Sequence, residues 1–261
     1  MSRKRHPRIA PRTYRAKPRI VDWIRTIGTA IVGAVATIVA GVTIIVIAAV
    51  KFDAAVIERI LRSWARLILA VAGVQVEMHS VDRLDPKQAY IVIANHRSIF
   101  DIMCLFAVLP IPIRFLAKRE LFEIPVFGAI LRSLRMVSID RSAADHPTIN
   151  AASASALDSG LSLVVFAEGT RVPAADSRPF KKGGFVIAQQ HNVPILPITL
   201  AGTGSILPPH GRIVRSANVA VIAAEPISSA ITATKSINEL VLETRTVVLR
   251  NERQWLPEQR K

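Results

Sequence analysis

The longest uncharged run of the chain covers residues 26–50 and reads TIGTAIVGAVATIVAGVTIIVIAAV. A helix of this length is long enough to cross the hydrocarbon layer of a membrane, which needs about 20 predominantly apolar residues. A cleaved signal peptide is the alternative, but its apolar region is usually about 7–15 residues long, and no clear small-residue cleavage site follows this run. The pattern therefore predicts a membrane-embedded helix.

Residues 56–71 have a different pattern, in which apolar side chains recur at helical spacing and charged side chains take the other face. The apolar positions are Val56, Ile57, Ile60, Leu61, Trp64, Leu67, Ile68 and Val71. The polar face is basic, which is typical of an amphipathic helix that lies in a membrane interface. A surface helix that packs on a globular domain is the alternative.

From Gln75 onward, short apolar runs alternate with helical patterns. The expected strands are VQVEMH, AYIVIA, IRFLA, RMVSID, LSLVVFA, PILPITLA and NVAVIAA, and the expected helices cover residues 98–109, 121–133, 146–159, 182–191 and 235–252. This alternation predicts an α/β fold with a mostly parallel sheet that is covered by helices on both faces. We expect a mobile basic arm over residues 1–25, membrane-associating helices over residues 26–74 and a globular domain over residues 75–261.

Charge and composition narrow the class of partner. The formal net charge is +15 at pH 7, and residues 1–25 hold many basic side chains against the single acidic Asp22. Such a chain attracts an anionic membrane, a phosphorylated substrate or a nucleic acid. Aromatic residues make up only 5% of the chain, which disfavours the stacking platforms of nucleic-acid binders, so we expect no nucleic-acid partner. The single cysteine, Cys104, excludes an intrachain disulfide and fits core packing.

Three polar stretches follow expected strands: NHRSIFD at residues 95–101, IDR at residues 139–141 and EGTR at residues 168–171. In a parallel sheet the carboxyl ends of the strands face one crevice, where ligands bind. We therefore expect these three stretches to contribute to one site.

The first stretch combines a helix start with a titratable pair. Ser98 and Asp101 fit a capping box, with Ser98 as the N-cap, and this explains both residues without chemistry. It does not explain His96, because a helix N-terminus disfavours the charged imidazole. A neutral imidazole is available as a base, and Asp101 in the first turn can fix its tautomer. A catalytic pair of His96 and Asp101 and a simple helix start both remain open at this point.

The stretch EGTR has features that suit an anion. Gly169 allows a tight turn that exposes backbone N–H groups, Arg171 offers a fork for phosphate, and Glu168 can accept hydrogen bonds from hydroxyl groups. The two lysines of FKKGG, residues 180–184, precede a helix start, which also favours an anion. An ordinary turn with solvated charges is the alternative, and Arg141 and Lys118 can likewise be read as surface charges.

Together these stretches resemble the glycerolipid acyltransferase family typified by bacterial lysophosphatidic acid acyltransferase. NHRSIFD resembles the NHxxxxD motif, MVSIDR resembles the second motif, VFAEGTR resembles FPEGTR, and VPILPI resembles the fourth motif. The segment from Phe115 through Pro125 to Gly128 also fits. The resemblance covers residues 74–224, and Ala167 departs from it because the family usually has proline there.

The resemblance implies an acyltransferase domain in which His96 is the general base and Asp101 orients it. The base would activate a lysolipid hydroxyl that attacks the thioester of acyl-CoA or acyl-carrier protein, with no acyl-enzyme. The resemblance further implies that Arg141 and Arg171, and more weakly Lys118, hold the acceptor's phosphate. Glu168 and Gly169 of the third motif would position the glycerol part, and Thr170 of the same motif would be a further substrate-binding residue. No metal and no cofactor are implied, and the other histidines form no cluster in the sequence.

The implied substrates raise a question of orientation. A basic arm held in the cytoplasm followed by one complete crossing would place the domain outside the cell. We therefore expect residues 26–50 to re-enter or to lie within one leaflet, which keeps the domain on the cytoplasmic face of the inner membrane. Alternative functions are acylation of another lysolipid, such as lyso-ornithine lipid, and a non-catalytic module that binds anionic lipids. The sequence does not indicate the oligomeric state.

Overall fold

A seven-stranded sheet forms the centre of the protein in a computed structural model, which describes residues 17–50, 53–80, 84–139, 146–173 and 176–258. Its strands are β1 (Val74–His79), β2 (Ile91–Ala94), β3 (Ile113–Lys118), β4 (Val137–Ile139), β5 (Ser162–Phe166), β6 (Ile195–Ala201) and β7 (Ala217–Ala223). The strand order is β1-β7-β6-β2-β5-β3-β4, and only β6 and β7 pair in antiparallel fashion. All seven predicted strands and the mostly parallel α/β fold are confirmed.

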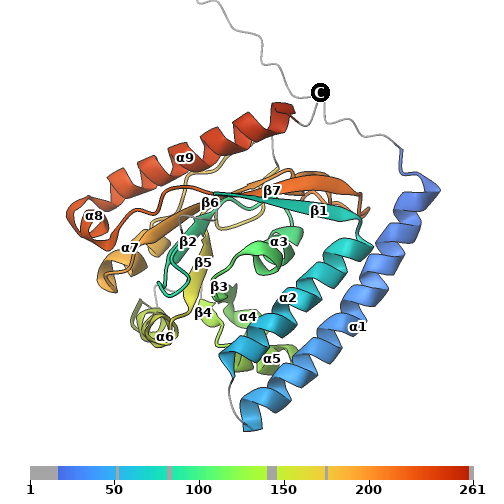
Figure 1. Cartoon of the computed structure of the whole chain (residues 1–261), viewed down its shortest axis with the longest axis horizontal. Coiled ribbons are helices and arrows are strands. Elements are labelled where there is room, and N and C mark those ends of the chain that lie inside the picture. Colours follow the sequence, from blue (N-terminus) through green and yellow to red (C-terminus); the bar gives the residue numbers. More distant parts are fainter. Residues whose placement is uncertain (1–16, 51–52, 81–83, 140–145, 174–175, 259–261) are drawn as a thin grey trace, which may run out of the picture.

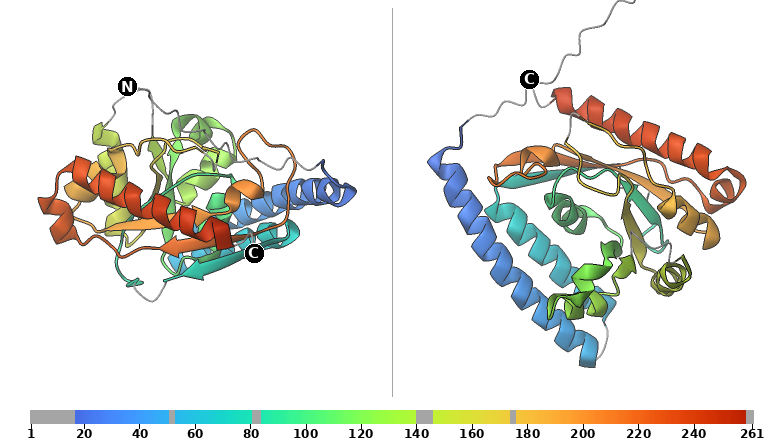
Figure 2. Two further views of the ribbon diagram at one scale, coloured as in Figure 1. Left: turned by 90° about the horizontal axis from the view of Figure 1, so that it is seen from above. Right: turned by 180° about the vertical axis from the view of Figure 1, so that it is seen from behind.

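Helices cover both faces of the sheet (Figures 1 and 2). One face carries α2 (Ala54–Val71), α3 (Phe100–Val108), α4 (Arg119–Glu123) and α5 (Phe127–Ser133), with α1 (Ile20–Val50) outside them. The other carries α6 (His146–Asp158), α7 (Gly183–Gln190) and α9 (Ile237–Glu258), with the short α8 (Ser229–Thr234) beside α7. Both sides of β2 are buried, because Val92 belongs to one core cluster and Ile91 and Ile93 to the other. This explains why β2 reads as a continuous apolar run.

The long N-terminal helix begins at Ile20, six residues before the uncharged run. The Asp22 carboxylate accepts a hydrogen bond from the backbone N–H of Arg19 and pairs with Arg25 at 3.1 Å, and these contacts stabilise the first turn. Residues 20–25, which we assigned to the basic arm, are therefore helical, and the rest of that arm lies largely outside the described residues. By length and composition, α1 could cross a membrane.

The amphipathic helix α2 buries its apolar face in the protein core rather than leaving it free. Ile57, Leu61 and Ile68 belong to the main core cluster. On the polar face, Arg62 and Arg66 donate hydrogen bonds to the carbonyls of Leu109 and Ala107 at the end of α3. This packing corresponds to the alternative reading of residues 56–71, and their location in a membrane interface stays a prediction.

Helices α1 and α2 run in opposite directions and form a hairpin (Figure 1). Gly73, just after α2, lies against the start of α1, because a Cβ atom added there would be 3.3 Å from Nε of Arg25. Thr26 near the start of α1 also accepts a hydrogen bond from the backbone N–H of Val214. The C-terminal end of α2 therefore lies beside the N-terminal end of α1.

Two predicted helices differ from the helices of the structure. The helix expected over residues 121–133 is α4 and α5, because Pro125 interrupts the backbone hydrogen bonds and Val126 adopts a φ of 65°. The helix expected over residues 235–252 begins at Ile237 and extends to Glu258, and the separate helix α8 precedes it. Neither change alters the order of the strands.

Candidate active site

The carboxyl ends of β2, β5 and β3 meet at one edge of the sheet, because these strands are parallel neighbours. Ala94 at the end of β2 pairs with Phe166 at the end of β5. The stretches NHRSIFD and EGTR therefore leave the sheet side by side, as the sequence predicted. The third stretch, IDR, follows the edge strand β4, and its Arg141 lies outside the described residues.

His96 and Asp101 form the pair that their spacing suggested. Nδ1 of His96 lies 2.7 Å from Oδ2 of Asp101, whose side chain is buried. The same carboxylate oxygen accepts the backbone N–H groups of Arg97 and Ser98 at 2.7 and 3.0 Å. A carboxylate can only accept here, so Nδ1 carries a proton and Nε2 presents a lone pair. The imidazole is thus arranged to take a proton at Nε2.

The ring of His96 has one defined orientation. It stacks on the ring of Phe166 with 3.9 Å between centroids and 9° between planes. Phe166 in turn stacks on Phe115, with 5.7 Å between centroids. The His96 side chain keeps 14% of its surface exposed, so the base is supported from one side and accessible to a substrate.

The predicted capping box forms only in part. Helix α3 begins at Phe100, one residue later than a Ser98 cap requires. The Asp101 carboxylate accepts the Ser98 N–H as a capping box demands, but the Ser98 hydroxyl donates to the carbonyl of Leu207 at 2.7 Å. The hydroxyl accepts only a long 3.4 Å bond from the N–H of Phe100. Ser98 therefore fastens the turn to the 207–214 loop.

Asn95 is a site residue whose role the sequence analysis did not identify. Its side-chain amide donates to the carbonyl of Leu200 at 2.9 Å and accepts the N–H of the same residue at 2.8 Å. These two bonds continue the pairing of β2 with β6 beyond the last residue of the strand. Asn95 directly precedes His96 in the sequence, and this position is the signal that could have indicated its role. A buried amide needs hydrogen-bond partners on both its oxygen and its nitrogen.

Glu168 has a different place from the one expected. Its carboxylate is buried, accepts the backbone N–H of His96 at 2.8 Å and receives Nη1 of Arg97 at 2.7 and 2.8 Å. The expectation that it holds the glycerol part of a substrate is therefore not supported by its contacts. Burial beside a guanidinium instead makes it a support for the backbone of His96.

The remaining predicted residues lie near the same edge, on its exposed side. Gly169 adopts a φ of 72°, which confirms the tight turn after β5. Thr170 and Arg171 are exposed, and so is Lys118 at the end of β3. Lys181 lies over the turn, because a Cβ atom added to Gly169 would be 2.9 Å from its Nζ. An anion near this turn would meet cationic side chains.

Ala167 adds a hydrogen bond that the usual proline could not make. Its backbone N–H donates to the carbonyl of Ala94 at 3.0 Å, which extends the pairing of β5 with β2. Its carbonyl accepts the N–H of Lys181 at 2.7 Å. The departure from the family motif therefore leaves the two site loops tied together.

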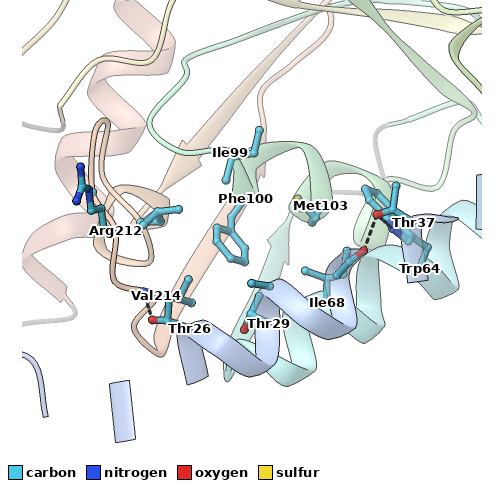
Figure 3. Close-up of a pocket in the computed structure, with 14 residues that line it drawn as sticks. Thr26, Thr29, Thr37, Trp64, Ile68, Ile99, Phe100, Met103, Arg212 and Val214 are labelled. Atoms are coloured by element: carbon cyan, nitrogen blue, oxygen red, sulfur yellow. Dashed lines mark hydrogen bonds between the residues drawn. The ribbon is translucent and has the colours of Figure 1, made fainter. Parts of the chain in front are cut away.

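A groove of about 340 Å³ lies between the N-terminal hairpin and helix α3 (Figure 3). On one side are residues of α1 and α2, among them Thr29 and Ile68, and on the other are Phe100 and Met103 of α3. Its lining is mainly apolar, and residues of the 207–214 loop close one end. The helix that presents Asp101 thus forms part of the wall.

The residues that the structure describes offer little support for a metal-dependent reaction or for a cysteine nucleophile. No group of three or more His, Cys, Asp or Glu residues that could hold a metal occurs among those residues, and the expectation of a metal-free reaction stays a prediction. Cys104 is fully buried. Burial raises the pKa of its thiol, and the charge of Asp101 raises it further, so this cysteine is a poor nucleophile.

Comparisons with known proteins agree with this description. Residues 75–201 match the family model described as Acyltransferase. The 1-acyl-sn-glycerol-3-phosphate acyltransferase of Saccharomyces cerevisiae is 30% identical over 172 residues, which cover 64% of this chain and 56% of that protein. The protein of the same name from Pseudomonas aeruginosa is 28% identical, over 53% of this chain and 56% of its own length. The chain spans about half the length of these curated relatives.

One solved structure has the same fold over nearly the whole chain. It is the 1-acyl-sn-glycerophosphate acyltransferase PlsC from Thermotoga maritima, with a TM-score of 0.79 and 23% sequence identity. The match covers 90% of this chain and 96% of that one. The likeness therefore includes elements outside residues 75–201.

Proposed function

We propose, on the premise that residues 75–201 form a domain of the Acyltransferase family, that this protein is a membrane-bound 1-acylglycerol-3-phosphate O-acyltransferase. It moves a fatty acyl group from acyl-CoA or acyl-carrier protein to the free hydroxyl of the lysolipid and gives phosphatidic acid for phospholipid biosynthesis. The observation that supports this most strongly is the contact of 2.7 Å between His96 and Asp101 at the end of β2.

The arrangement suggests how each bond changes. Nε2 of His96 takes the proton of the acceptor hydroxyl, and the oxygen attacks the carbonyl carbon of the thioester. A C–O bond forms, the C–S bond breaks, and the proton passes from the imidazolium to the departing thiolate. Asp101 stabilises the positive charge on the imidazole between these steps. Neither Cys104 nor Ser98 is needed as an acyl carrier, since the first is buried and the second is bonded to Leu207.

The acceptor's phosphate binds at the turn after β5. Lys181 lies over Gly169, Arg171 follows this glycine by two residues in the chain, and Lys118 lies at the end of the neighbouring strand, so all three can supply positive charge. Arg141 is a further phosphate ligand by resemblance. Thr170 contributes a hydroxyl and Gly169 contributes the tight turn, so that backbone groups can approach the ligand.

An acyl chain of a substrate occupies the groove between α1 and α3. Its apolar lining suits a hydrocarbon chain, and its volume lies at the lower end of the usual range for ligand sites, about 300–1,000 Å³. Phe100, which lines it, directly precedes Asp101. A chain held there would lie against the helix that carries Asp101.

The N-terminal hairpin attaches the protein to one side of the inner membrane, with the catalytic domain on the cytoplasmic face. The outer side of α1 is apolar along its length, from Ile24 through Val35 to Val46. Its other side packs on α2 and α5, so a crossing would draw parts of the domain into the bilayer. Because the hairpin returns to its starting end, a leaflet-embedded hairpin keeps the domain and the end of the basic arm together.

The test is acyl transfer from labelled acyl-CoA and acyl-carrier protein to lysophosphatidic acid and lyso-ornithine lipid in parallel. Transfer to lysophosphatidic acid is the expected result. Transfer only to the ornithine lipid would keep the chemistry but replace the acceptor. No transfer to either acceptor, with membrane binding intact, would favour a non-catalytic module that binds anionic lipids.

A further inference from the structure

Arg97 is the residue of NHRSIFD whose long side chain is buried, with Nη1 3.4 Å from the backbone carbonyl oxygen of His96. It is 1% exposed, and its guanidinium meets two buried carboxylates. Nη1 contacts both oxygens of Glu168 at 2.7 and 2.8 Å. Nε and Nη2 donate to the two oxygens of Glu252 at 2.6 and 2.8 Å, in a bidentate fork.

These contacts link three distant parts of the chain. Glu252 lies in the last helix, α9, beyond residues 75–201. Glu168 follows β5 and also accepts the N–H of His96. The path from α9 therefore runs through Arg97 to Glu168 and ends on the backbone of His96.

The charges of this cluster are unusual for a buried site. One guanidinium faces two carboxylates, and the carboxylate of Asp101 lies close enough to act on Glu252. Burial raises the pKa of the Glu252 carboxyl, although Arg97 opposes the rise. Burial by itself lowers the pKa of Arg97, but Glu252 and Glu168 outweigh it and hold the guanidinium charged. A buried ion pair often adds little to the free energy of unfolding. The placement of this cluster next to His96 therefore indicates a role in holding the base.

We propose that Arg97 and Glu252 are positioning residues for the general base, and that α9 thereby holds the His96 turn in its catalytic geometry. This inference rests on the proposed acyl transfer. Neither side chain touches the reacting atoms. Their effect passes through Glu168, whose carboxylate fixes the N–H of His96, and through Arg97 itself, whose backbone N–H is bonded to Asp101.

The test measures kcat and KM of the full-length membrane enzyme with Glu252→Gln, which keeps the size of the side chain but removes its charge and one acceptor. We expect kcat per folded molecule to fall about 10- to 100-fold, as for misplaced catalytic groups and lost supporting contacts. KM for donor and acceptor should stay unchanged, because the loss concerns the transition state. The matched control is Glu243→Gln on the same helix, where the carboxylate is exposed and pairs with Lys235.

Arg97→Lys provides the second variant, since it keeps the charge but loses the fork that spans both carboxylates. Its kcat should fall in the same way, and the double variant should lose no more than the larger single effect. Should Glu252→Gln fail to fold, Arg97→Lys gives the same test. Normal kcat per folded molecule in either variant, or a change in KM alone, overturns the inference. An inactive wild-type enzyme would instead refute the proposed function.

Discussion

His96 lies in a turn, residues 95–98, in which each residue is hydrogen-bonded to another part of the protein. Asn95 is bonded to β6, His96 to Glu168, Arg97 to α9, and Ser98 to the 207–214 loop. Such a turn leaves the imidazole little freedom, and preorganisation of this kind lowers the cost of reaching the transition state. The activity should therefore be sensitive to changes that leave the fold intact.

Asp101→Asn is the sharpest change within the pair. The amide keeps the size of the side chain but removes the charge that stabilises the imidazolium. We expect the acyl-transfer rate to fall about 10²- to 10⁴-fold, the range that general-base catalysis contributes. Steady-state rates and the thermal midpoint of the purified enzyme measure this. A nearly normal rate would show that Asp101 only starts the helix.

Lys181 and Lys182 form a matched pair for the phosphate site, since they are neighbours and both exposed. The three side-chain atoms nearest to a Cβ added at Gly169 all belong to Lys181. Lys181→Met should raise KM for lysophosphatidic acid about tenfold, which corresponds to a charge-assisted hydrogen bond of about 1.4 kcal/mol. Lys182→Met should leave this KM unchanged. Equal effects of the two variants would mean that the lysines act only through the general field of the surface.

The sequence identified the base and its partner but not the network behind them. His96 and Asp101 are five residues apart in one motif, so their contact follows from a short turn. Glu252 lies 155 residues from Arg97 in the chain, and no local pattern relates the two. For the same reason the sequence alone points to Glu168 as a substrate ligand, since the arginine that pairs with it lies 71 residues away in the chain.

At the scale of elements, α1 packs on α5 at Gly41. A Cβ atom added there would lie 2.2 Å from Cδ1 of the buried Ile130. Gly41→Ala should therefore lower the free energy of unfolding by about 1–3 kcal/mol, as overpacked core positions do. Thermal unfolding in detergent measures this. Gly33→Ala in the same helix is the control, because an added Cβ atom meets nothing within 4 Å there.

Gly33 also lines the groove, so a larger side chain there should narrow it. We expect Gly33→Leu to shift the acyl-chain preference toward shorter substrates without loss of folding. Rates with long-chain and short-chain donors and lysolipids measure the shift. Val35→Leu is the control on the exposed side of α1. An unchanged preference in Gly33→Leu would exclude the groove as the chain site.

Element boundaries were predictable where one local signal dominates. The seven strands were found because each is a short apolar run between polar turns. The break between α4 and α5 was missed, although Pro125 was present to indicate it. Hydropathy does not predict the start of α1 at Ile20, because the first turn depends on the hydrogen bond that Asp22 accepts from the N–H of Arg19.

At the scale of the whole molecule, the α1–α2 hairpin determines on which side of the membrane the catalytic domain lies. The end of α2 lies beside Arg25 of α1, so the domain should lie on the same side of the membrane as the basic arm. In sealed inside-out vesicles, a tag on the C-terminus should be digested by added protease. In right-side-out vesicles the same tag should be protected. Protection in inside-out vesicles would contradict a cytoplasmic domain.

The central claim is that the pair of His96 and Asp101 catalyses acyl transfer to a lysolipid. The most direct measurement is formation of phosphatidic acid from labelled acyl donor and lysophosphatidic acid by wild type and by His96→Ala. His79→Ala is the matched control, because this histidine ends β1 and is half exposed. We predict that His96→Ala loses about 10²- to 10⁴-fold of the rate while His79→Ala keeps it. A wild-type rate in His96→Ala would contradict the assignment of the base.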